Sequence, residues 1–155
     1  MHEEFLRRAI QLAVENVRQG RGGPFGAVIV ADGEIIAEGA NHVTTDLDPT
    51  AHAEIVAIRA ACRLLGRFDL RGAVIYSSCE PCPMCLGAIY WARLDALYYA
   101  AGREDAAQAG FDDRFLYEQF ALAEAERSLP TRRIPLAEAG QPFALWLDSP
   151  GRVPY

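Results

Sequence analysis

The segment Pro81-Cys82-Pro83-Met84-Cys85 follows His52-Ala53-Glu54 in the chain, and together the two segments hold three side chains of metal-binding type. The two prolines indicate that a helix begins here, so Cys82 and Cys85, three positions apart, are expected to share one helix face. This spacing suits a tetrahedral zinc ion, and we expect His52 to be the third ligand.

Three protein ligands leave a fourth zinc position open for water, which is typical of a catalytic zinc site. His52 and Glu54 can both reach one metal only if they lie at the amino-terminal end of a helix. Asp48-Pro49 predicts such an end, with Asp48 as N-cap and a helix that continues to about Leu65. We therefore expect Glu54 to lie beside the bound water and to transfer its protons as general acid and base.

The rest of the chain alternates between helical and strand-like patterns. Helices are predicted over 3–19, from Asp48 to about Leu65, from Pro81–Pro83 onward, and from Asp112 to about Ala125. Strands are predicted over 26–31, 34–40, 73–77, 94–101 and, near a sheet edge, 131–136. Asp32-Gly33 predicts a hairpin between the first two strands. This order favours an α/β fold with three layers, in which helices cover both faces of a central mixed sheet of about five strands.

Length and charge narrow the classes of protein further. The chain has 155 residues, so we expect a single domain over 1–155. Its net charge is −6 and it contains no lysine, which argues against binding nucleic acid or a membrane surface through bulk charge. We find neither a signal peptide nor an apolar run near the roughly 18 residues of a membrane span, and we expect a cytoplasmic location.

An H-x-E motif followed by P-C-x-x-C is the signature of zinc deaminases. The chain resembles the cytidine and deoxycytidylate deaminase superfamily, and within it the short bacterial guanine deaminases. The resemblance rests on four stretches: 22–27, 48–54, 78–89 and 109–113.

This resemblance implies a cytidine-deaminase-like fold, one zinc ion per subunit and conversion of the free base guanine to xanthine, with Glu54 carrying the proton. It also implies a homodimer and a tail, 141–155, that covers an active site of its own subunit or of the partner. The substrate contacts that it implies are the Asn41 side chain, the Ala53 backbone, the aromatic rings of Phe25 and Trp91, Asp113 at the guanine edge, and the tail residue Tyr155.

Other interpretations stay open at this point. A tRNA adenosine deaminase would share the zinc motifs, as would a deaminase of another small ring such as cytosine or an aminotriazine, and a zinc-stabilised binding module would need no catalysis. Cys79, Cys82 and Cys85 also form the C-x2-C-x2-C run of some iron–sulfur proteins. Several site candidates have structural alternatives: Asn41 as a turn residue, Asp113 as a helix cap, and Phe25 and Trp91 as core aromatics.

Overall fold

The structure is a computed structural model that describes residues 1–155. The chain divides into two compact units, Met1–Asp113 and Arg114–Tyr155. The elements of the first unit are α1 (His2–Arg18), β1 (Gly26–Ala31), β2 (Glu34–Ala40), α2 (Val43–Asp46), α3 (Ala53–Leu65), β3 (Ala73–Cys79), α4 (Pro83–Trp91), β4 (Ala96–Ala101) and α5 (Arg103–Gln108). Those of the second unit are α6 (Arg114–Ala121), the 3-10 turns η1 (Glu124–Glu126) and η2 (Ala137–Gly140), and α7 (Gln141–Asp148).

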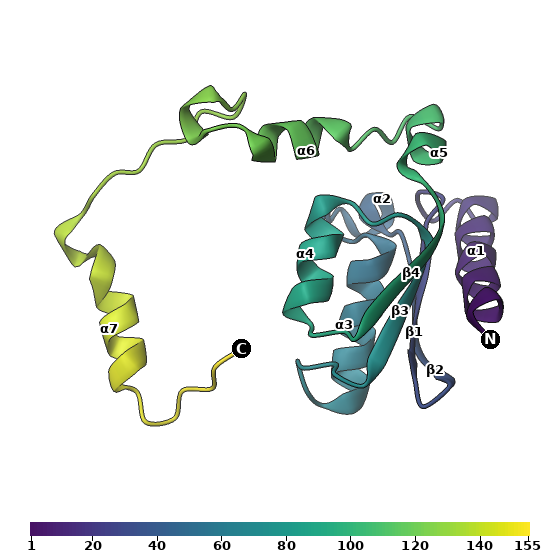
Figure 1. The fold of residues 1–155 in the computed structure, drawn as a ribbon, viewed down its shortest axis with the longest axis horizontal. Coiled ribbons are helices and arrows are strands. Elements are labelled where there is room, and N and C mark those ends of the chain that lie inside the picture. Colours follow the sequence, from purple (N-terminus) through teal and green to yellow (C-terminus); the bar gives the residue numbers. More distant parts are fainter. The chain divides into compact units, whose positions relative to one another are not determined.

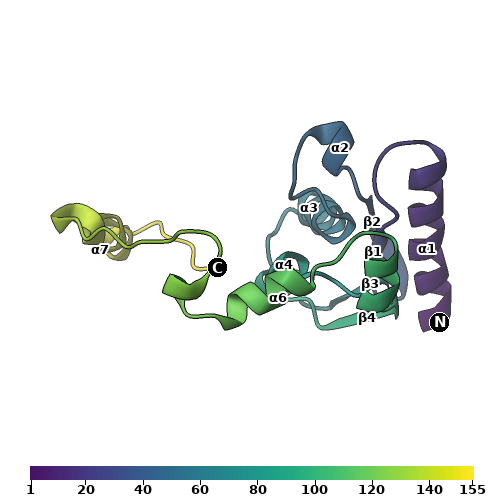
Figure 2. The same cartoon turned by 90° about the horizontal axis from the view of Figure 1, so that it is seen from above.

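The four strands of the first unit form one mixed sheet in the order β2-β1-β3-β4. Strand β1 runs antiparallel to both β2 and β3, whereas β3 and β4 are parallel and are connected through α4. Helix α1 covers one face of the sheet, and α3 and α4 cover the other (Figures 1 and 2). The predicted three-layer α/β/α architecture is confirmed.

Two glycines let the helices approach the sheet closely. A Cβ atom on Gly26 of β1 would lie 2.2 Å from the Ala9 carbonyl oxygen of α1. A Cβ atom on Gly39 of β2 would lie 2.2 Å from the Ala53 carbonyl oxygen of α3. Any larger residue at either position would push a helix off the sheet, and Gly39 thereby sets the depth of the end of α3 that carries the metal ligand.

The predicted hairpin between β1 and β2 is present. Asp32 and Gly33 have φ angles of 52° and 81°, the positive values that a two-residue turn with right-handed strand twist requires. The strands on either side have the predicted bounds, 26–31 and 34–40.

The sheet has four strands, so the expectation of about five is wrong. The predicted strand over 131–136 is absent: these residues have no regular secondary structure and are exposed. Pro135 lies within this segment and Pro130 precedes it. Proline has no backbone N–H to give to a ladder, so Pro135 removes one donor from the middle of the expected pairing.

The helix that carries His52 begins later than predicted, at Ala53 rather than at Pro49. The Asp48 carboxylate accepts hydrogen bonds from the Thr50 backbone N–H at 2.8 Å and from the Thr50 hydroxyl at 2.7 Å. Because this local turn occupies the side chain, Asp48 caps no helix. His52 is the N-cap of α3 instead.

The second unit differs from its prediction as well. The helix expected from Asp112 to about Ala125 is the shorter α6, and the tail 141–155, for which no helix was predicted, contains the helix α7. No residue between Arg114 and Tyr155 is buried. None of the helices in the chain is long and apolar enough to cross a membrane.

Candidate active site

The three predicted metal ligands lie at the amino-terminal ends of two helices. His52 is the N-cap of α3 and Cys82 is the N-cap of α4, both with extended backbone angles, and Cys85 follows in the first turn of α4. Helix amino termini carry partial positive charge, which favours negative charge on a cysteine placed there. His52 and Glu54 both lie at the start of α3, although this helix begins at Ala53 rather than at the predicted Pro49.

The geometry of these three side chains fits a tetrahedral zinc ion. The His52 Nδ1 atom lies 3.5 Å from the Cys82 Sγ atom and 3.5 Å from the Cys85 Sγ atom. Zinc bonds of about 2.0–2.1 Å to nitrogen and about 2.3 Å to sulfur, at a tetrahedral angle, would separate N and S by about 3.5–3.6 Å. The three ligand atoms lie within 4.8 Å of one another, and one nitrogen with two sulfurs is a donor set that suits zinc.

The two cysteines differ in charge in this arrangement: Cys85 keeps its proton, and the negative charge lies on Cys82. A hydrogen bond from Cys85, assisted by His52, lowers the pKa of Cys82 to about 4. The same hydrogen bond, with burial, raises the pKa of Cys85, and the hydrogen bond to Cys82 raises the pKa of His52. The site thus already concentrates negative charge on sulfur where a divalent cation would bind.

Glu54 lies next to the ligands, in the first turn of α3, and is only 6% exposed. Its Oε1 atom accepts a hydrogen bond of 3.0 Å from the hydroxyl of Ser77 in β3. Burial raises the pKa of Glu54, while its hydrogen bonds act in the opposite direction. A buried carboxyl group with a raised pKa is suited to accept and return protons near neutral pH.

Asn41 lies at the end of β2 and is 7% exposed. Its Oδ1 atom accepts hydrogen bonds from the backbone N–H of Gly23 at 3.3 Å and of Val43 at 3.2 Å. Since the oxygen has two donors, the amide orientation is fixed and its Nδ2 atom is left to donate to a ligand. Ala53, the first residue of α3, is fully buried.

Asp113 is half-buried at the end of the first unit. Burial raises the pKa of its carboxyl group, and the negative charge of Cys82 adds to this effect, whereas Arg103 opposes it. Asp113 and the metal site are therefore within electrostatic reach of each other.

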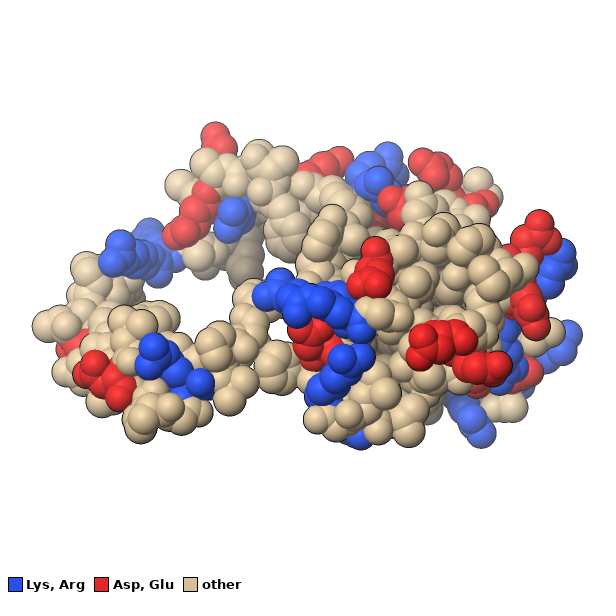
Figure 3. Space-filling view, turned by 60° about the horizontal axis from the view of Figure 1, so that its bottom comes forward, with Lys and Arg blue, Asp and Glu red and all other residues tan.

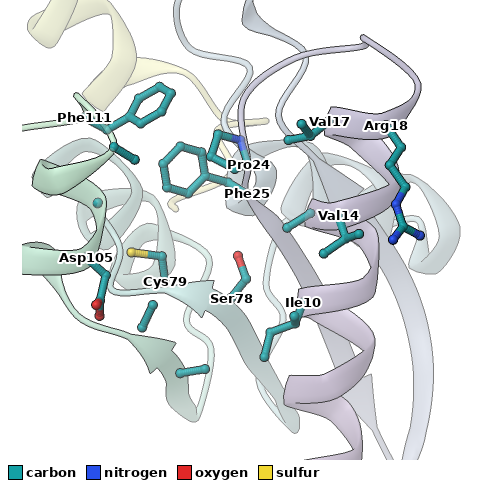
Figure 4. Close-up of a pocket in the computed structure, with 15 residues that line it drawn as sticks. Ile10, Val14, Val17, Arg18, Pro24, Phe25, Ser78, Cys79, Asp105 and Phe111 are labelled. Atoms are coloured by element: carbon teal, nitrogen blue, oxygen red, sulfur yellow. The ribbon is translucent and has the colours of Figure 1, made fainter.

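An apolar cavity of about 620 Å³ lies between α1 and α5 (Figure 4). Phe25 and Phe111 stand on its wall with an edge-to-face contact of 5.0 Å between ring centroids. Cys79 also lines it, and its thiol donates to the Gly102 carbonyl oxygen at 3.6 Å. Burial raises the pKa of Cys79 to about 11, so it stays a thiol, and it is not among the grouped metal-ligating side chains. The iron–sulfur interpretation is therefore not supported.

Trp91 and Tyr155 are the two remaining predicted contacts. Trp91 is the last residue of α4, at the end opposite Cys82, and is 63% exposed, with the Arg93 guanidinium 5.9 Å from its ring centroid. Tyr155 is the last residue of the chain, in the second unit.

Sequence reasoning missed Ser77 and Phe111 as parts of this region. Ser77 and Ser78 lie near the end of β3, a mostly apolar buried strand, and two consecutive hydroxyl residues at that place were a usable signal. Phe111 lies within the motif 109–113 but gave no signal of its own, because its contact with Phe25 joins segments far apart in the chain.

Comparisons with known proteins agree with this geometry. Residues 1–101 match the family described as the cytidine and deoxycytidylate deaminase zinc-binding region. A guanine deaminase of Bacillus subtilis (strain 168) is 56% identical over 154 residues, which cover 99% of both chains. An X-ray structure of guanine deaminase from Bacillus subtilis superposes with a TM-score of 0.98 at 55% identity, covering 100% of this chain and 99% of that one.

More distant relatives match a smaller part. A tRNA-specific adenosine deaminase of Agrobacterium fabrum is 51% identical over 78 residues, 50% of this chain and 51% of that protein. A structure of guanine deaminase from Nitrosomonas europaea has a TM-score of 0.66 at 33% identity, covering 70% of this chain and 63% of that one. The match over residues 1–101, the full-length relative and the histidine–cysteine site together show that the chain belongs to the cytidine and deoxycytidylate deaminase family.

Proposed function

We propose that this protein is a zinc-dependent aminohydrolase that converts the free base guanine to xanthine and ammonia. The observation that carries the proposal is the full-length similarity to a guanine deaminase, 56% identity over 99% of both chains, in a structure that brings His52, Cys82 and Cys85 together. The tRNA-specific adenosine deaminase of Agrobacterium fabrum, by contrast, matches over only half of this chain.

The reaction replaces the exocyclic C–NH2 group of guanine with C=O. Water supplies the oxygen atom. One of its protons leaves with the amino nitrogen as ammonia, and the other ends on the ring nitrogen next to the new carbonyl group. His52, Cys82 and Cys85 would hold the zinc ion, which when bound acts as a Lewis acid and lowers the pKa of water.

Glu54 would carry the proton in this reaction. Its raised pKa suits a carboxyl group that accepts a proton from water and then donates it to the leaving nitrogen. The hydrogen bond from Ser77 to Oε1 restricts rotation of the carboxylate, so the proton is exchanged at a fixed position.

Asn41 and Asp113 would recognise the purine through hydrogen bonds. With its Oδ1 atom already engaged, Asn41 can offer only its Nδ2 donor, which matches a ring nitrogen or carbonyl acceptor of guanine. The Asp113 carboxylate can accept hydrogen bonds from the N–H groups of the guanine edge. The Ala53 backbone and the Phe25 ring complete the contacts that we propose within the first unit.

We propose Trp91 and Tyr155 as further substrate contacts, and this part of the proposal rests on the family resemblance. We propose that the tail 141–155, which ends in Tyr155, covers an active site, and that the protein is a homodimer in which the tail serves its own or the partner's site. This proposal is supported by Phe143, Leu145 and Trp146, which are exposed in a unit that buries no residue.

Nucleic acid is not part of the proposed function. On the face shown in Figure 3, basic side chains stand beside acidic ones instead of forming a continuous basic surface, in keeping with the net charge of −6. We place the activity in the cytoplasm, because a reducing compartment protects the thiolate ligands.

The test is ammonia release by the zinc-loaded protein from guanine, guanosine, adenine, cytosine, an aminotriazine and a tRNA stem-loop, with Glu54→Ala as the control. We expect release from guanine and none from the stem-loop. Release from the stem-loop without release from guanine would overturn the proposal. It would indicate a tRNA adenosine deaminase instead.

A further inference from the structure

Helix α1 carries an unexpected polar residue on its buried face. The buried residues of this helix are Phe5, Ala9, Ala13 and Asn16, a stripe at helical spacing whose last member is an amide. Asn16 is only 3% exposed. A buried amide is unfavourable unless it is hydrogen-bonded, so its partners show what the position requires.

The Asn16 side chain bridges two segments of the proposed active site. Its Nδ2 atom donates to the Gly23 carbonyl oxygen at 2.9 Å and to the Asn41 carbonyl oxygen at 2.8 Å. The Gly23 carbonyl also accepts from the Phe25 backbone N–H at 2.9 Å. One planar amide therefore fixes the loop that carries Phe25 against the end of β2.

These bonds complete the immobilisation of Asn41. Its backbone N–H donates to the Phe25 carbonyl oxygen at 3.1 Å, its carbonyl accepts from Asn16, and its Oδ1 atom accepts from Gly23 and Val43. Every polar group of Asn41 other than Nδ2 is engaged. Gly22 adds a steric constraint, since a Cβ atom there would lie 2.1 Å from the Asn41 carbonyl oxygen.

The unpaired atom of Asn16 argues that its role is more than packing. Its Oδ1 atom is buried and has no hydrogen-bond partner. Leucine has the same number of side-chain heavy atoms, branched at the same position; it would extend the apolar stripe and would leave no unpaired oxygen of its own. Asparagine therefore carries a desolvation penalty that leucine would avoid, and what it provides in return is the paired donation to two carbonyls.

We propose that Asn16 is a positioning residue: by donating to the Gly23 and Asn41 carbonyls, it holds the Asn41 amide and the Phe25 loop in the geometry that binds the purine ring. This inference rests on the proposed function and deepens it. Asn16 itself need not touch the substrate.

A double-mutant cycle tests this role. The four zinc-loaded proteins are the wild type, Asn16→Leu, Asn41→Ala and the double variant, each assayed for zinc content, melting temperature, and kcat and KM on guanine. We expect Asn16→Leu to keep its zinc and lose about 10- to 100-fold in kcat/KM, with a raised KM, because small misplacements of a binding group are costly. In the Asn41→Ala background the same change should cost less than about 3-fold, since the group that it positions is already gone.

Ala9→Gly is the matched control. It weakens the same buried face of α1 without touching the amide, so it should lower the melting temperature and leave kcat/KM unchanged. An unchanged kcat/KM in Asn16→Leu, or an equal loss in both backgrounds of the cycle, would overturn the inference. If Asn16→Leu does not fold, Asn16→Ala enters the same cycle. If the wild type releases no ammonia from guanine, it is the proposed function that fails, and the cycle is then run on the base that the wild type does deaminate.

Discussion

The two compact units of the chain differ in how they are held together. Met1–Asp113 contains a four-stranded sheet between helices, a buried core and all three metal-ligating side chains. Arg114–Tyr155 contains short helices and 3-10 turns, and none of its residues is buried. A segment with so little internal burial has little to offset the entropy of ordering it. The comparison shows that the three metal-ligating side chains belong to the unit with a buried core, while the second unit has no buried core of its own.

Removing a metal ligand should have the largest effect on the first unit. We expect Cys82→Ala to lose zinc and all measurable turnover, because two ligands hold the ion far less well than three. If free zinc stands about 1,000-fold above its dissociation constant, the lost binding also lowers the free energy of unfolding by about 4 kcal/mol. Zinc content after gel filtration and thermal unfolding measure both effects.

Cys62→Ala is the matched control, since Cys62 lies in α3 outside the metal-ligating group. It should keep both zinc and activity. A Cys82→Ala protein that kept stoichiometric zinc would show that the ligand assignment is wrong.

Glu54→Gln separates chemistry from stability within the first unit. The amide keeps the shape of the carboxyl group but cannot carry the proton, so kcat should fall by about 10²- to 10⁴-fold while zinc stays bound. Single-turnover kinetics and zinc analysis check this outcome. Glu4→Gln, the same change in the first turn of α1, should leave turnover unchanged. Near-normal turnover in Glu54→Gln would assign the proton transfer to another group.

Deleting residues 141–155 tests the second unit directly. If the tail covers an active site, its removal admits water and weakens substrate binding, so kcat/KM on guanine should fall by about 10-fold or more. Because the first unit holds the core and the metal site, zinc content and its melting temperature should change little. A deletion variant with full activity would contradict the covering role, and loss of zinc would show that the two units are not independent.

The same contrast explains which parts of the fold and of the site could be predicted from the sequence. The grouping of His52, Cys82 and Cys85 was predictable because metal chemistry demands particular residues at short spacings. The turn at Asp32-Gly33 was predictable because it needs positive φ angles. Contacts between distant segments were not predictable, as the Ser77–Glu54 and Asn16–Asn41 bonds show.

The start of α3 was misjudged because Asp48 bonds to Thr50 locally, a competition that propensity rules do not decide. The second unit was the least predictable part. Its strand prediction failed at 131–136, where no neighbouring strand pairs with the segment, and its helix α7 has no buried face to set a period in the sequence.

The smallest effect that we expect concerns an ion pair that anchors α1 to β2 in the first unit. The Arg8 guanidinium donates to both carboxylate oxygens of Glu38 at 2.7 Å, and these hydrogen bonds hold the pKa of Glu38 below its usual range. A carboxyl group whose pKa is lowered on folding stabilises the protein above its unfolded pKa, and this stabilisation is lost as the pH falls through the folded value. Both side chains are about one-third exposed (33% and 36%), so Glu38→Gln should lower the free energy of unfolding by only about 0.5–1 kcal/mol at pH 7. Urea unfolding of the zinc-loaded proteins should show this difference in full at pH 7 and shrinking below about pH 4.5, near the ordinary glutamate pKa. A difference that did not change with pH would mean that the Gln variant disturbs the packing of α1 on β2 rather than the ion pair.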